Sequence, residues 1–185
     1  MSLTNQQQQL LLNLAKESIK YGLVYGESLP VDTKNYSVKL REIRGVFVTL
    51  EIDKQLRGCI GTLEALNPIV VDVAKNAFLA AFQDSRFPPL SEKEYLNLSI
   101  HISILSPCEP IIFESEADLI RQLQPHEDGL ILQEGLQRGT FLPSVWESLP
   151  EAQQFLQHLK LKTGLPKNYW SDTLQVHRYR CETVG

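Results

Sequence analysis

Two strand-like runs separated by three residues constrain the fold most strongly. In Val46–Ile52, Val, Leu and Ile side chains alternate with Phe47, Thr49 and Glu51, as in a half-buried strand. The run at residues 56–62 follows after Asp-Lys-Gln and has the same alternation. We therefore expect a β-hairpin with one apolar and one polar face.

The register of this hairpin follows from matching its faces, because a slip of one residue turns every side chain over. A loop of residues 53–55 aligns the two apolar faces. It predicts four cross-strand pairs: Ile52 with Leu56, Glu51 with Arg57, Thr49 with Cys59 and Val48 with Ile60.

The remaining elements alternate irregularly between helix and strand. Thr4 and Gln7 have capping-box spacing before a helix that ends near Gly22, and Asn67 caps a helix over Ile69–Phe82 with Pro68 as its first residue. Residues 84–89 form a rigid loop, and Ser91 with Glu94 caps a short helix. Strands are predicted at 98–104, 129–132 and 174–181, helices at 116–124, 144–148 and 151–161, and a turn at 135–139.

This order has no regular strand–helix–strand repeat, which favours an α+β fold with a mainly antiparallel sheet flanked by helices. The 185 residues suit one compact domain over residues 1–185, with room for two subdomains, and bury about 70% of the unfolded surface.

Composition excludes several classes of partner. The chain has 18 basic and 22 acidic residues, a formal charge of -4 and no basic run, so nucleic acid is not expected. No apolar run approaches the ~18 residues of a membrane span, and the polar N-terminal segment does not resemble a signal peptide. We expect a cytoplasmic protein.

The three cysteines, Cys59, Cys108 and Cys181, are widely spaced and include no Cys-x-x-Cys pair. No zinc, phosphate-loop, dinucleotide or iron–sulfur motif is present. We therefore predict reduced thiols, no structural metal and no bound cofactor.

Several motifs occur together in one order. Residues 56–61 read Leu-Arg-Gly-Cys-Ile-Gly and follow Gly-Val-Phe-Val-Thr-Leu at 45–50. Asp-Ser-Arg-Phe-Pro-Pro-Leu stands at 84–90, Ile-Leu-Ser-Pro at 104–107 and Gly-Thr-Phe-Leu-Pro-Ser-Val-Trp at 139–146. Over residues 5–180 the chain resembles the AMMECR domain family, which includes AmmeMemoRadiSam system protein A.

The resemblance implies a compact α+β fold and, in many microbes, association with a Memo-like protein and a radical S-adenosylmethionine protein. It implies no particular reaction. Lys160 stands where the family pattern has a cysteine, which argues against a mechanism that needs two thiols.

The motif at 56–61 is the main candidate site. On a strand, Arg57 and Cys59 project from one face about 7 Å apart, so the guanidinium can favour a thiolate. Gly58 and Gly61 would let a ligand approach the backbone closely. Cys59 is then a candidate nucleophile with Arg57 as stabiliser. In the alternative interpretation Cys59 is a buried core residue, Arg57 pairs with Glu51 and the glycines serve helix packing.

Arg86 is a second candidate, because its loop placement suits recognition of a carboxylate or phosphate. Its alternative role is to pair with Asp84 at the end of the preceding helix. His101 lies on a polar strand face and is either a general base or an ordinary hydrogen-bonded histidine. We expect ordinary positions on the last strand, with no functional role, for His177, Arg178 and Arg180.

Two functions remain open. In the first, the protein is a binding or accessory module that recognises a protein partner or a small anionic ligand through Arg57, Gly58, Cys59, Gly61 and Arg86. In the second, it is an enzyme with Cys59 as nucleophile and Arg57 as thiolate or oxyanion stabiliser. The sequence favours the first, since it shows no base partner for Cys59.

Overall fold

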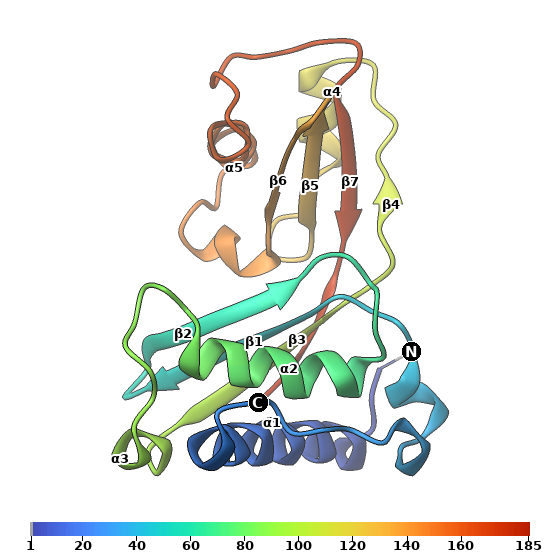
Figure 1. Cartoon of the computed structure of the whole chain (residues 1–185). Helices are drawn as coiled ribbons and strands as arrows, with labels where there is room; N and C mark the ends of the chain where they lie inside the picture. The colour runs from blue at the N-terminus through green and yellow to red at the C-terminus, as the bar shows by residue number, and fades with distance from the viewer. Residues whose placement is uncertain (1) are drawn as a thin grey trace. The chain divides into compact units, whose positions relative to one another are not determined.

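The computed structural model describes residues 2–185, which form an α+β fold with two four-stranded sheets (Figure 1). The predicted fold class is confirmed, and the strands divide between two compact units. The first unit comprises residues 2–105 with 182–185, and the second comprises residues 106–181. Among the described residues, no helix is both long and apolar enough to cross a membrane.

The sheet of the first unit has the strand order β2-β1-β3-β8. Its strands are β1 (Val46–Ile52), β2 (Gln55–Thr62), β3 (Ser99–Leu105) and β8 (Cys181–Val184). Strand β1 pairs antiparallel with both β2 and β3. Strand β2 therefore lies at an edge of the sheet.

Three α-helices belong to the first unit: α1 (Asn5–Tyr25), α2 (Ile69–Phe82) and α3 (Glu92–Tyr95). The capping boxes of α1 and α3 are both present. Helix α1 runs past the predicted end to Tyr25, and Gly26 caps it with a left-handed φ of 73°. The N-cap of α2 is Pro68 instead of Asn67, whose side chain donates to Asp72. Short 3₁₀ turns span Thr33–Asn35 and Val38–Arg41.

Helices α1 and α2 pack against each other and against the same sheet (Figure 1). The face of β1 toward the helices carries Val46, Val48 and Leu50, all fully buried. Helix α2 is apolar nearly all round, as expected for a helix between a sheet and a second helix. The opposite face of β1 therefore carries its more polar side chains.

The hairpin turn differs from the prediction. Asp53 and Lys54 alone form the loop, and both have left-handed φ values, 52° and 63°. This geometry is typical of a type I′ turn, whose twist matches that of paired strands. Ile52 therefore pairs with Gln55, and the predicted pair of Ile52 with Leu56 is wrong.

A β-bulge restores the register beyond this shorter loop. Glu51 pairs with Leu56 and Leu50 with Gly58, so that Arg57 is the extra residue of the bulge. The predicted pair of Glu51 with Arg57 is wrong for this reason. Further along, the predicted pairs of Thr49 with Cys59 and Val48 with Ile60 are confirmed.

The sheet of the second unit has the order β4-β7-β5-β6. Its strands are β4 (Glu109–Pro110), β5 (Gly129–Glu134), β6 (Gln137–Phe141) and β7 (Gln175–Tyr179). The predicted turn at 135–139 is confirmed only at Gly135 and Leu136, and residues 137–139 belong to β6 instead. The predicted strand at 174–181 is divided into β7 and β8, which belong to different sheets.

Helices α4 (Glu116–Gln122) and α5 (Ala152–Lys162) and the 3₁₀ turn Pro143–Glu147 complete the second unit. Its core includes Trp146, whose ring stacks on Phe155 at 3.8 Å between centroids. The fully buried Lys160 forms an ion pair with Glu116 at 2.6 Å. The second unit therefore contains a buried charge that no apolar pattern could predict.

Candidate functional site

The bulge directs the side chain of Arg57 toward α3 and the loop before it. Nε donates to Glu94 Oε1 at 2.8 Å, and Nη2 donates to the carbonyl of Pro88 at 2.8 Å. Arg57 is 8% exposed, and its Nη1 is buried with no hydrogen-bond partner among the described residues. Arg57 therefore ties edge strand β2 to α3.

Glu94 also accepts several hydrogen bonds. It accepts hydrogen bonds from Arg57 and from the backbone and hydroxyl of Ser91. These hydrogen bonds lower the pKa of Glu94 to about 2, and the bond from Arg57 has the largest effect. The acidic partner of Arg57 is thus Glu94 and not Glu51.

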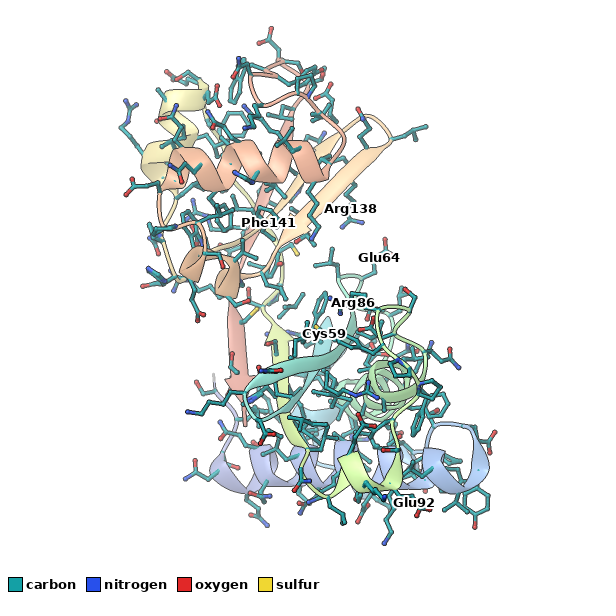
Figure 2. All side chains as sticks on the ribbon, turned by 90° about the vertical axis from the view of Figure 1, so that its left-hand side faces the viewer. Cys59, Glu64, Arg86, Glu92, Arg138 and Phe141 are labelled. Carbon is teal, nitrogen blue, oxygen red and sulfur yellow. The ribbon has the colours of Figure 1, made fainter. Side chains whose placement is uncertain are left out.

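The backbone of Cys59 is covered by the loop that follows α2. The N–H of Cys59 donates to Asp84 Oδ2 at 2.9 Å, and its carbonyl accepts from Arg86 Nη2 at 3.3 Å. Because β2 is an edge strand, these two bonds satisfy backbone groups that no neighbouring strand reaches. Figure 2 shows Cys59 and Arg86 next to each other.

Asp84 and Arg86 form a two-bond pair. Arg86 Nε donates to Oδ1 at 2.9 Å and Nη2 to Oδ2 at 2.7 Å. The hydrogen bonds from Arg86 hold the pKa of Asp84 well below its usual range, and the Asp84 carboxylate raises the pKa of Arg86. The Asp84 side chain is 4% exposed, whereas that of Arg86 is 53% exposed.

The ring of Phe87 is close to both arginines. The guanidinium carbon of Arg57 is 5.7 Å from the centre of the Phe87 ring, and that of Arg86 is 5.5 Å from it. Arg57, Cys59 and Arg86 are therefore brought together in the first unit, although α2 separates them in sequence. That they border one concave surface remains a prediction.

The Cys59 sulfur lies on the sheet face away from α2. Thr49 Oγ1 donates to Sγ at 3.3 Å across the hairpin. On the other side of Thr49, the same face carries His101, whose Nε2 is 3.6 Å from Glu51 Oε2. This face of the first sheet therefore carries the Cys59 thiol, the Thr49 hydroxyl and the His101 imidazole on three adjacent strands.

The space beside each glycine of the motif is filled by other atoms of the protein. A Cβ built on Gly58 would lie 2.1 Å from the carbonyl oxygen of Ala80 in α2. A Cβ on Gly61 would lie 2.3 Å from the ring of Phe47. Gly58 therefore allows α2 to pack closely against β2, and Gly61 leaves space for the ring of Phe47.

The other sequence candidates lie in the second unit. His177 belongs to β7. Arg178 Nη1 lies 3.6 Å from Asp128, and Arg180 pairs with Glu127 at 2.9 Å. Burial raises the pKa of Cys108 and raises that of Cys181 to about 12, so these thiols resist ionisation. All three cysteines are free thiols.

Sequence reasoning missed Glu94 and Thr49 as members of the site. The sequence indicates only a capping role for Glu94, since no local pattern pairs it with a residue 37 positions earlier. Thr49 had a usable signal, because the correct register already placed it opposite Cys59. A threonine directly across from a cysteine is within hydrogen-bonding reach.

The comparisons with known proteins agree with this fold. The AMMECR1 family model matches residues 12–184. A protein of Methanothermobacter thermautotrophicus is 37% identical over 148 residues, 77% of this chain and 75% of that protein. A Thermotoga maritima protein is 36% identical over 160 residues, 85% of this chain and 87% of that one. The crystal structure of the uncharacterised protein PH0010 from Pyrococcus horikoshii superposes with a TM-score of 0.88 and 31% identity, covering 98% of this chain and 92% of that one.

Proposed function

The chain belongs to the AMMECR1 family, and we propose that it is a binding or accessory module that recognises a carboxylate or phosphate beside Cys59 through Arg86. The group belongs to a protein partner or to a small anionic ligand presented to that partner. The family resemblance points to a Memo-like protein and a radical S-adenosylmethionine protein as the partners.

One observation carries this proposal: Arg86 is rigidly held and yet half exposed. Its backbone N–H, Nε and Nη2 all bond to Asp84, and Nη2 also reaches the carbonyl of Cys59. Buried Asp84 therefore fixes the guanidinium plane while 53% of the side chain stays accessible. A guanidinium oriented before binding loses less entropy when it captures an anion.

Arg57 contributes to the proposed site indirectly. Its charge is offset by Glu94 and its side chain is buried, so a ligand reaches it only by displacing protein contacts. Its bonds to Glu94 and to the Pro88 carbonyl hold the loop that carries Arg86. We assign Arg57 the role of a positioning residue for Arg86.

The test compares two exposed arginines that each pair with an aspartate. Arg86→Lys keeps the charge next to Asp84 and removes the planar fork, and Arg121→Gln removes the matched pair with Asp118. Binding of purified Memo-like protein from the same host is measured by titration calorimetry. We expect Arg86→Lys to weaken binding about tenfold or more and Arg121→Gln to leave it unchanged. Equal affinity of wild type and Arg86→Lys would remove Arg86 from the interface.

A second function is favoured by the hydrogen bond from Thr49 to the Cys59 sulfur. In this case Cys59 is the nucleophile of an enzyme, because the thiolate is the reactive form of cysteine. At pH 7, Cys59 should then react with iodoacetamide faster than Cys108, whose pKa burial raises. A Cys59 rate at or below that of Cys108 would count against catalysis by this thiol.

A further inference from the structure

The outer edge of strand β2 presents two residues whose backbone groups point away from β1. In an antiparallel pair, successive residues alternately bond to the neighbouring strand and point away from it. The N–H and C=O of Cys59 bond to the side chains of Asp84 and Arg86, so Cys59 is a residue of the outward kind. Gly61 follows two residues later, opposite Phe47. It therefore directs its own N–H and C=O to the same edge.

The backbone of Gly61 is available for pairing. Neither its N–H nor its C=O has a hydrogen-bond partner in the part of the chain that the structure describes. Gly61 is half-buried, and Thr62 after it is exposed. An unpaired donor and acceptor at a sheet edge form a template for another extended chain. The open stretch of this edge is short, because side chains already bond to the outward groups of Cys59.

The guanidinium of Arg86 lies at one end of this open stretch. Its Nη2 donates to the Cys59 carbonyl at 3.3 Å, which puts the group at the outer edge of β2 (Figure 2). Asp84 takes up the side of the guanidinium that carries Nε and Nη2. Nη1 makes no hydrogen bond to any described residue, and the side chain is half exposed. A cationic donor is therefore available one outward residue before Gly61.

We propose that the edge of β2 at Gly61 binds the C-terminal end of an extended peptide, with the terminal carboxylate on Arg86. This inference rests on the anion recognition by Arg86 that is proposed above. One peptide residue exchanges both backbone hydrogen bonds with Gly61, as in strand addition to an open sheet edge. The peptide runs antiparallel to β2, because only that direction brings its C-terminus to the end of the edge where Arg86 lies.

The geometry favours a chain end over an internal acidic segment. An added strand that continued past Gly61 toward Cys59 would have to displace the side chains of Asp84 and Arg86 from the Cys59 backbone. Both side chains are held there by their mutual ion pair. A peptide that stops at this point ends in a carboxylate, which supplies a negative charge next to the exposed guanidinium. Backbone pairing and charge complementarity thus select the same ligand.

The test begins with random heptapeptides displayed on phage with free C-termini and selected against the full chain. The most enriched peptide is synthesised with a C-terminal carboxylate and with a C-terminal amide, and fluorescence polarisation measures the affinity of each. We expect the amide to bind about tenfold more weakly or worse, as for loss of a charged hydrogen bond. Equal affinity of the two peptides would overturn the inference, and so would a selection without enrichment.

Methylation of single peptide amides tests the strand pairing without a change in the protein. Methylating the amide that donates to the Gly61 carbonyl should weaken binding by about threefold to tenfold, as for loss of one hydrogen bond. Methylating either adjacent amide, which points away from β2, should change the affinity by less than about twofold. Equal sensitivity of every amide, or sensitivity of none, would contradict addition of the peptide to the edge strand.

Arg86→Lys separates this inference from the proposed function, and Arg121→Gln is again the matched control. We expect Arg86→Lys to weaken binding of the carboxylate peptide about tenfold and to leave the amide peptide nearly unchanged. If Arg86→Lys weakens binding of the Memo-like protein while carboxylate and amide peptides bind equally to the wild type, anion recognition stands and the chain-end inference fails. If neither the Memo-like protein nor the carboxylate peptide responds to Arg86→Lys, both proposals fail.

Discussion

The guanidinium of Arg57 and the carboxylate of Glu94 form a two-bond ion pair, with Nε 2.8 Å from Oε1 and Nη2 3.3 Å from Oε2. The two partners are unequally solvated, since the side chain of Arg57 is 9% exposed and that of Glu94 is 35% exposed. Removing Glu94 should therefore lower the free energy of unfolding by a different amount than removing Arg57. An unpaired Glu94 can still be hydrated, whereas an unpaired Arg57 stays in a poorly solvated place.

This asymmetry predicts that Glu94→Gln destabilises the protein more than Arg57→Met. Glutamine preserves the capping box with Ser91, so Glu94→Gln removes mainly the charge. We expect a loss of about 2–4 kcal/mol for Glu94→Gln and about 1–2 kcal/mol for Arg57→Met. Urea unfolding followed by circular dichroism measures both, because α1 and α2 in the first unit dominate the helical signal.

The order of the two effects is the decisive result. A larger loss for Arg57→Met would mean that the hydrogen bonds of the guanidinium to Glu94 and to the Pro88 carbonyl, and not the cost of an unpaired charge, dominate the stability of this contact. The double variant should be less destabilised than the sum of the single variants, because the pair is lost only once.

Acid should weaken the first unit through Glu94 and Asp84. The folded protein lowers the pKa of Glu94 from 4.5 to about 2, and the pKa of Asp84 is lowered as well. A lowered carboxyl pKa gives stability that is present above the unfolded value and is lost as the pH falls toward the folded value. We expect the urea midpoint to fall between pH 5 and pH 2, and the gap between wild type and Glu94→Gln to narrow over that interval. A gap that is constant from pH 7 to pH 3 would contradict this origin.

The alternation of apolar residues carried most of the fold prediction. It located Val46–Ile52 and Ile69–Phe82 with their observed bounds, because one-sided burial imposes a clear period. It failed at residues 135–139, where Gln137, Arg138 and Gly139 lack that period and yet form β6. Strand β6 pairs with β5, so its conformation comes from a neighbour and not from its own composition.

The site was predictable only in part for a related reason. Cross-strand matching placed Thr49 opposite Cys59 correctly, since the apolar faces of the two strands define that register. The same reasoning failed for Arg57, because the left-handed turn at Asp53 and Lys54 shortened the loop and the bulge compensated. Local pattern does not reveal a compensating pair of irregularities. The sequence therefore predicts Glu51 as the partner of Arg57, whereas the structure has Glu94.

The ion pair of Lys160 with Glu116 predicts a second asymmetry, in the second unit. Lys160 is fully buried, lies 5.6 Å from the centre of the Trp170 ring and is held by Glu116 at 2.6 Å. Lys160→Met fills the same space without a charge and should change stability by less than about 1 kcal/mol. Glu116→Ala leaves a buried ammonium unpaired and should cost about 3–5 kcal/mol.

Tryptophan fluorescence measures both variants, because Trp146 and Trp170 are the only tryptophans and both lie in the second unit. Equal losses for Lys160→Met and Glu116→Ala would indicate that the lysine itself stabilises the core. In that case the lysine would be more than a tolerated replacement for an apolar residue.

Gly58 provides the sharpest test of packing at the edge strand. An alanine Cβ at this position would lie 2.1 Å from the carbonyl oxygen of Ala80, a backbone atom that can move only if α2 moves. We expect Gly58→Ala to cost about 2–4 kcal/mol. Gly26→Ala is the control, since Gly26 has a left-handed φ of 73° and open space around it, and should cost about 1–2 kcal/mol from backbone strain alone.

The second substitution tests whether the obstacle is backbone. Ala80→Gly should not rescue Gly58→Ala, because the carbonyl oxygen remains when the side chain is removed. Since α2 leads into the loop that carries Arg86, a displaced helix should also disturb the contact of Arg86 with Cys59. Gly58→Ala should therefore lower the reactivity of Cys59 toward iodoacetate more than toward iodoacetamide, whereas Gly26→Ala should leave that ratio unchanged. A stable Gly58→Ala variant with a wild-type ratio would show that α2 accommodates the methyl group without moving the site.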